Sequence, residues 1–238
     1  MENVYRIHMG KARCAVDLGD GSERGEYVNQ DYILGKLGRP HRSISLMYCY
    51  YPLDAGWPGR ASVVHASPDV SFAWDFPYDD YFTYKGGLGG NTDGEPFQYM
   101  REIRQHGQDV SLTLTIDPHV TDEHLIAIAN DLRPFGRVFL RINHEATGNW
   151  FSFNKRCTYQ EVADFFVRAS RVIKEHAPNV QTIICIGGIE DLSKEEMEKE
   201  AEFAQTIPAA DIWSVDKYMA LHWGWPYDVA EHGGDTHS

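Results

Sequence analysis

Short β-branched, apolar runs alternate along this chain with longer segments of helical period. The strand-like runs occupy residues 43–51, 109–117, 136–145, 180–188 and 210–218, with a weaker one at 69–76. The helical segments occupy residues 96–107, 122–135, 158–178 and 193–207. This order predicts repeated βα units. Such units form a parallel sheet that is either open and doubly wound or closed into a barrel.

The polar residues within two of these runs favour the barrel. In residues 110–117 apolar residues alternate with Ser111, Thr113, Thr115 and Asp117. In residues 138–145 they alternate with Arg141, Asn143 and Glu145, which we expect on one face. Doubly wound sheets are usually apolar on both faces, whereas a (β/α)8 barrel gathers polar groups at the C-terminal ends of its strands. We therefore predict an α/β fold of the TIM-barrel type, with Asp117, Glu145 and Tyr218 around that end.

The number of βα units predicts an incomplete barrel. About six of the eight units of a barrel are recognisable, so we expect strands seven and eight after Ser238. The domain prediction is an N-terminal extension over 1–30, for which a β-hairpin is one interpretation, followed by a partial barrel over 31–238. The glycine-rich run 85–90 is interpreted as a flexible loop over the mouth. Thr121 or Asp122, Thr158 with Glu161, and Ser193 with Glu196 are expected to cap helices.

Charge and composition exclude several partners. The net charge of -13 argues against nucleic acid and anionic membranes, because phosphate groups would meet like charge. No apolar run approaches the roughly 18 residues of a membrane span, so we expect a soluble chain with a neutral ligand. The compartment stays open, with secretion expected where a signal peptide has been removed. The four cysteines form no CxxC pair, and no metal or cofactor is predicted.

The run "LRINHEATGNWFSF", residues 140–153, resembles the fourth-strand signature of clan A glycoside hydrolases, most of all glycoside hydrolase family 26. That family consists chiefly of β-mannanases and related β-glycanases. The residues that match are Arg141, His144, Glu145, Gly148, Trp150 and Phe151. Thr147 stands where the family usually has Asn. The segment 211–219 resembles the family segment ending in Asp-x-Tyr, which implies that Tyr218 hydrogen-bonds the catalytic nucleophile.

The resemblance implies a retaining endo-β-glycanase that hydrolyses β-linked plant-type polysaccharide or oligosaccharide, with β-mannan as the expected substrate. Glu145 would be the general acid/base. The nucleophilic Glu would follow the seventh strand, beyond residue 238, since a retaining pair needs two carboxyls about 5–5.5 Å apart. Four other carboxylates could replace this nucleophile, but none has the strand position expected of it: Asp117, Glu190, Asp216 and Glu231. A complete barrel is expected to be a monomer.

Several side-chain roles have two interpretations. The resemblance to family 26 implies that His144 reaches the sugar or the catalytic carboxylates. The alternative is a histidine of the core. Arg141 is catalytic or pairs with an inward carboxylate, and Asn143 binds a sugar hydroxyl or only its neighbours. Aromatic faces suit a pyranose, although Trp223 and Trp225 also fit loop packing. The residues expected to bind substrate are Trp150, Asn143, Phe151, Asp117, Trp223 and Trp225.

Two other functions stay open. One is a catalytically incomplete barrel that only binds polysaccharide. The other is a barrel with metal-dependent sugar chemistry that uses Asp117, Glu145 and a histidine. A zincin protease is excluded, because Gly148 occupies the position of the second histidine in HExxH.

Overall fold

A computed structural model describes residues 35, 38–39, 41–57, 82–148, 151–186 and 201–215, and the backbone alone of 17–19, 152 and 155. The strands are β1 (Asp17–Gly19), β2 (Ser43–Tyr50), β3 (Asp109–Ile116), β4 (Val138–Ile142), β5 (Val180–Ile186) and β6 (Ile212–Val215). The helices are α3 (Phe97–Gln105), α4 (Asp122–Leu132), α5 (Ser152–Arg156), α6 (Tyr159–His176) and α8 (Thr206–Ala209), with a 3-10 turn η4 at Arg133–Phe135.

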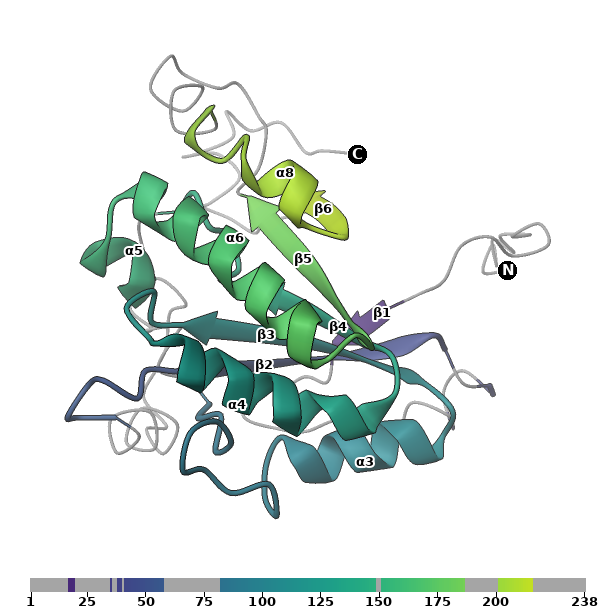
Figure 1. Ribbon diagram of the computed structural model, residues 1–238. Helices are drawn as coiled ribbons and strands as arrows, with labels where there is room; N and C mark the ends of the chain where they lie inside the picture. Colours follow the sequence, from purple (N-terminus) through teal and green to yellow (C-terminus); the bar gives the residue numbers. More distant parts are fainter. Residues whose placement is uncertain are drawn as a thin grey trace, which may run out of the picture.

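The order of strands in the sheet is the order of strands in the chain. All neighbours from β1 to β6 pair in parallel. Right-handed crossovers that always step the same way place their helices on one face, and Figure 1 shows α3, α4 and α6 on the same side. A doubly wound sheet reverses its strand order instead. The described strands therefore have the order of a partial TIM barrel, while barrel closure stays a prediction.

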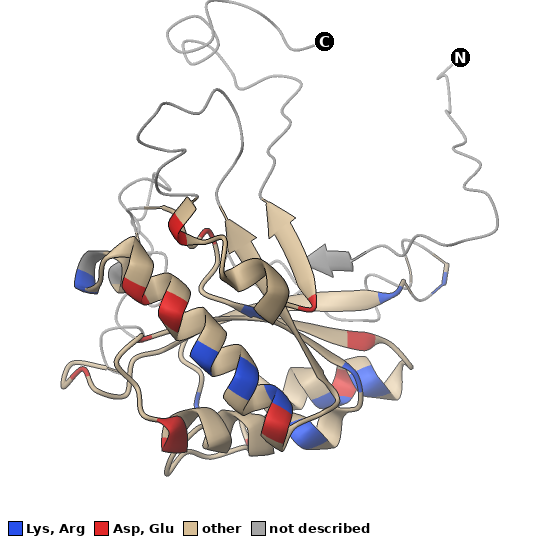
Figure 2. Ribbon diagram, turned by 45° about the horizontal axis from the view of Figure 1, so that its top comes forward, with Lys and Arg blue, Asp and Glu red and all other residues tan. Residues whose placement is uncertain are grey.

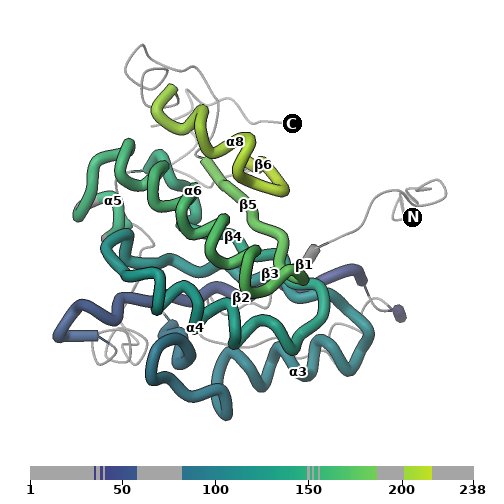
Figure 3. The backbone as a smooth tube through the Cα atoms, viewed as in Figure 1, coloured from purple at the N-terminus to yellow at the C-terminus, as the bar shows by residue number. Residues whose placement is uncertain are grey.

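The chain steps across the sheet one βα unit at a time, as the tube in Figure 3 shows from β2 through α4 to α6. Helix α6 shows how the sequence builds the outer layer. Its buried face includes Val162, Phe165, Phe166 and Ile173. Its exposed face carries charges of both signs (Figure 2). Burying one apolar stripe against the sheet and neighbouring helices leaves the polar stripe in water.

Strand β3 lies in the centre of the core. Every residue from Asp109 to Ile116 is buried, including the polar Ser111, Thr113 and Thr115. Both of its faces are therefore covered, as expected where helices pack on one side and the barrel interior on the other. The sequence pattern correctly identified this strand and the alternation of polar side chains along it.

Two strand predictions need correction. The predicted strand 136–145 ends at Ile142, because the backbone leaves the extended conformation at Asn143. Residues Asp17–Gly19 fall in the predicted N-terminal extension, yet they pair in parallel with Ser43–Ser45 of β2. Three further predictions lie outside the described residues: the remainder of the extension over 1–30, the weak strand 69–76 and the helix cap at Ser193.

The glycine-rich run 85–90 packs against the helical layer. Asp131, in the last turn of α4, accepts hydrogen bonds from Gly87 N (2.6 Å) and Tyr84 Oη (3.0 Å). Leu88 N donates to Tyr50 Oη at 3.1 Å. Burial raises the pKa of Asp131, against the opposing effect of these two donors. The run is therefore packed between α4 and Tyr50, the last residue of β2, and its place over the mouth stays a prediction.

The capping box that starts α6 is present as predicted. Glu161 N donates to Thr158 Oγ1 at 3.2 Å, and Thr158 N donates to Glu161 Oε2 at 2.7 Å. We expect Thr158→Ala to lower the free energy of unfolding by about 1 kcal/mol, measured by chemical denaturation. Thr121→Ala is the control, because Thr121 is the N-cap of α4 but makes no side-chain cap bond. Equal losses in both variants would contradict this role.

Candidate functional site

The segment after β4 forms a turn at the C-terminal edge of the sheet, and we call residues 143–148 the β4 turn. Asn143 N donates to Leu114 O of β3 at 3.2 Å. Ala146 N donates to Cys185 O of β5 at 2.8 Å. Since β3 and β5 flank β4 in the sheet, the turn is fixed on both sides. It presents its side chains at the end of the sheet where parallel barrels place catalytic groups.

The backbone of the β4 turn is unusual at two positions. Asn143 has φ of 54° and Glu145 has φ of 48°, both in the left-handed region. Asn adopts this conformation readily, but for Glu it costs about 1 kcal/mol or more. Such conformations concentrate at functional sites. They also end the regular strand at Ile142, so the strand alternation that predicted Arg141, Asn143 and Glu145 on one face does not extend to Asn143 and Glu145.

Asn143 anchors the turn to the neighbouring strand. Its Oδ1 accepts a hydrogen bond from Ile116 N at 2.7 Å, and only 1% of the residue is exposed. Its Nδ2 is buried and lacks a hydrogen-bond partner in the described part of the chain. From α5, Asn154 Nδ2 donates to Ala146 O at 2.8 Å. Asn143 therefore binds its neighbours with one end and leaves a donor available with the other.

Arg141 and His144 form a pair beside Glu145. Arg141 Nη1 lies 3.4 Å from His144 Nδ1. Because a guanidinium only donates, His144 Nδ1 is the acceptor, and a neutral ring carries its proton on Nε2. The inward carboxylate expected for Arg141 is not found among the described residues, whose ion pairs do not include Arg141. Its Nε is buried and without a hydrogen-bond partner there.

Phe151 packs against the β4 turn through the ring of His144. It is 2% exposed, and its ring stacks on Phe153 with centroids 5.4 Å apart. Its edge meets the His144 ring, with centroids 6.0 Å apart. This burial gives Phe151 a packing role and leaves little surface for the sugar contact that the sequence predicted. The other predicted site residues Tyr218, Trp150, Trp223 and Trp225 lie outside the described residues, as do Glu190, Asp216 and Glu231.

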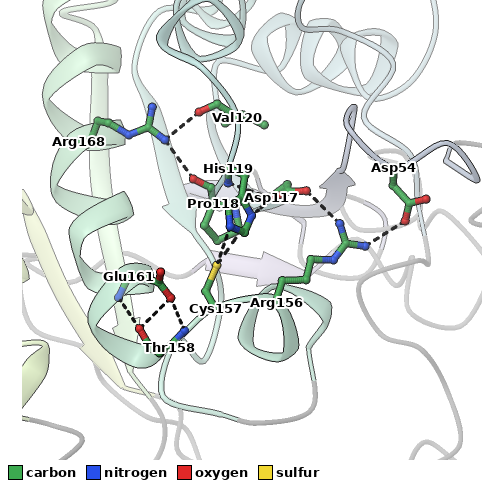
Figure 4. Close-up of polar contacts among 10 residues, drawn as sticks. All are labelled: Asp54, Asp117, Pro118, His119, Val120, Arg156, Cys157, Thr158, Glu161 and Arg168. Carbon is green, nitrogen blue, oxygen red and sulfur yellow. Dashed lines mark hydrogen bonds and ion pairs between the residues drawn. The ribbon is translucent and has the colours of Figure 1, made fainter.

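Asp117 follows β3 at the same edge of the sheet, as predicted, but its oxygens are occupied. Oδ2 accepts from Arg156 Nη1 at 2.9 Å, and Oδ1 accepts from His119 N at 2.9 Å (Figure 4). Arg156 Nη2 also donates to Asp54 Oδ2 at 3.0 Å. The Arg156 guanidinium lies 4.6 Å from the Tyr51 ring centroid. Asp117 thus holds its own neighbours rather than presenting a vacant carboxylate.

The sequence patterns did not predict this second group of side chains. The signal nearest to it is the Asp-x-His spacing of Asp117 and His119 directly after a strand. Arg156 and Asp54 are distant in sequence from Asp117, so only the fold brings them together. Among the described residues, no group of three or more His, Cys, Asp or Glu side chains is arranged to hold a metal ion. No helix in that part of the chain is long and apolar enough to cross a membrane.

The comparisons with known proteins find likenesses among solved structures only. No protein-family model matches the sequence, and the search of curated proteins finds no match. Among solved structures, the Ignisphaera aggregans GH53 catalytic domain is similar, with a TM-score of 0.42 and 13% sequence identity. The likeness covers 84% of this chain and 54% of that domain. A likeness at this TM-score carries no argument for family or activity.

Proposed function

We propose that this chain is a glycoside hydrolase that acts on β-linked polysaccharide, with Glu145 as the general acid/base. The observation that carries the proposal is the left-handed backbone of Glu145 at the C-terminal edge of the sheet. The sheet has the strand order of a barrel, and barrels place catalytic residues at that edge. A strained carboxylate there, next to the Arg141–His144 pair, fits a proton-transfer role.

The proposed reaction follows the retaining mechanism. Glu145 protonates the leaving glycosidic oxygen while a second carboxylate attacks the anomeric carbon, and Glu145 then activates the water that releases the sugar. His144 and Arg141 position Glu145 and the substrate. Tyr218 is proposed as the hydrogen-bond donor to the second carboxylate. β-Mannan is the proposed substrate, on the resemblance of residues 140–153 to family 26.

The first test is hydrolysis by the full chain. It is incubated with β-mannan and a panel of other β-linked polysaccharides, and new reducing ends are measured. Binding of the matching oligosaccharides is measured by calorimetry. Hydrolysis that is lost in Glu145→Gln but kept in Glu123→Gln, an exposed change on α4, supports the proposal. Binding without hydrolysis supports the polysaccharide-binding barrel instead, and neither binding nor hydrolysis rejects both functions.

Trp150 is proposed as an aromatic platform for a sugar ring. We expect Trp150→Ala to weaken oligosaccharide binding by about 1–2 kcal/mol, because aromatic contact and apolar area are lost. The melting temperature should change little. Trp213→Ala is the control, since Trp213 is 45% exposed and is paired in register with Ile184, which is buried. A large loss of stability with unchanged affinity would assign Trp150 to the core.

A further inference from the structure

Cys157, His119 and Asp117 lie together at the C-terminal edge of the sheet (Figure 4). Asp117 Oδ1 is 3.0 Å from His119 Nδ1. Cys157 Sγ is 3.8 Å from His119 Nε2 and 4.0 Å from Nδ1. Asp117 follows β3, His119 lies in the loop before α4, and Cys157 immediately precedes the capping box of α6. Two separate segments, the loop after β3 and the residue before α6, therefore bring a carboxylate and a thiol to the same imidazole, with the sulfur almost equally far from the two ring nitrogens.

The contacts decide which nitrogen of His119 carries the proton. An ionised carboxylate only accepts hydrogen bonds, so Nδ1 donates to Asp117. In the neutral ring Nε2 then has a lone pair, and it is the ring nitrogen nearer to the thiol. This is the order of groups by which an orienting carboxylate and a histidine base activate a nucleophile.

The loop that carries His119 is fixed and open to solvent. Arg168 of α6 donates to Pro118 O at 3.1 Å and to Val120 O at 2.8 Å. The second oxygen of Asp117 is held by Arg156. The His119 side chain nevertheless remains 57% exposed, so a ligand can reach it. Base catalysis requires the exposed ring to turn so that Nε2 points at Sγ, which now lies almost equally far from both nitrogens; such contacts are often long or poorly aligned in the free enzyme.

The thiol by itself is a poor nucleophile at neutral pH. Burial, followed by the nearby Glu161 and Asp117 carboxylates, raises the pKa of Cys157 to about 11, against a smaller lowering by Arg156. Few thiolates are present near pH 7 at such a pKa. Rapid reaction of Cys157 at that pH therefore requires a base that removes the proton as the sulfur attacks.

We propose that Cys157, His119 and Asp117 form a nucleophilic site that accepts acyl groups from small esters, separate from the proposed glycosidase chemistry. Sγ attacks the ester carbonyl and forms an S–C bond while its proton passes to His119 Nε2. The ester C–O bond breaks, and the departing alcohol takes that proton from the imidazolium. Water then cleaves the thioester, with Nε2 again accepting the proton and returning it to sulfur.

The test uses p-nitrophenyl acetate and the full chain near pH 7. We expect a burst of p-nitrophenol and one acetyl group on the peptide that contains Cys157, seen by mass spectrometry. Cys157→Ala should lose both. His119→Gln should slow acetylation of Cys157 by about 100-fold, within the range for general-base catalysis. The control is His106→Gln, directly after α3, which should react like the unchanged chain.

The pH dependence separates base catalysis from simple thiolate attack. With His119 as base, the rate should level off at a pH well below the thiol pKa of about 11. In His119→Gln it should instead rise steadily with pH. The charged groups around His119 are Asp117, Asp54, Asp122, Arg156, Glu161 and Arg168. A steady rise in the unchanged chain, or equal rates in the chain and in His119→Gln, overturns the proposal.

Discussion

Glu145→Ala is expected to slow hydrolysis of unactivated β-glycans by about 10²–10⁴-fold, the usual contribution of general acid catalysis. Aryl glycosides with good leaving groups should be affected much less in their first step, because their leaving oxygen needs little protonation. The measurement is kcat/KM on both substrate classes. Equal losses on the two classes would count against an acid role for Glu145.

The left-handed backbone at Glu145 offers a second comparison. Glycine adopts φ of 48° without the steric cost that alanine bears there. We expect Glu145→Gly to be more stable than Glu145→Ala by about 1 kcal/mol, with both variants inactive on unactivated glycans. If Gly and Ala are equally stable, the conformation stores no strain, and the backbone argument for a functional Glu145 fails.

Periodicity in the sequence was enough for the order of elements. Alternating apolar residues identified β3, and the Thr158 and Glu161 pair identified the start of α6, because these signals depend on neighbours in the chain. The same local reasoning gave βα order and hence a parallel sheet. It favoured a barrel-type arrangement, with which the observed strand order agrees.

Periodicity was insufficient where the backbone departs from a regular element. Polar residues alternate through Glu145 as if the strand continued, yet left-handed Asn143 and Glu145 end it. Nothing in an alternating pattern distinguishes an extended residue from one fixed by contacts to Leu114 and Cys185 on neighbouring strands. The ion pair between Asp117 and Arg156 was not predicted either, because α4 and β4 lie between the two residues in the chain. Only the folded arrangement brings them together.

The glycines of run 85–90 show a third limit, because glycine marks both flexible and tightly packed backbone. Gly87 has φ of 80°, and a methyl group there would lie within 2.6 Å of the Tyr50 ring. Gly89 has φ of 71° but nothing within 4 Å of the same position. The two glycines share a left-handed conformation and differ in the space around them.

Gly87→Ala is therefore expected to lower the free energy of unfolding by about 2–4 kcal/mol, through the left-handed cost plus displacement of Tyr50. Gly89→Ala should lose only about 1–2 kcal/mol, the conformational cost alone. Chemical denaturation of both variants measures the difference. Equal losses would mean that Tyr50 does not restrict residue 87. The run would then be a flexible loop after all, and the hydrogen bonds from Gly87 to Asp131 and from Leu88 to Tyr50 would not hold it on the helical layer.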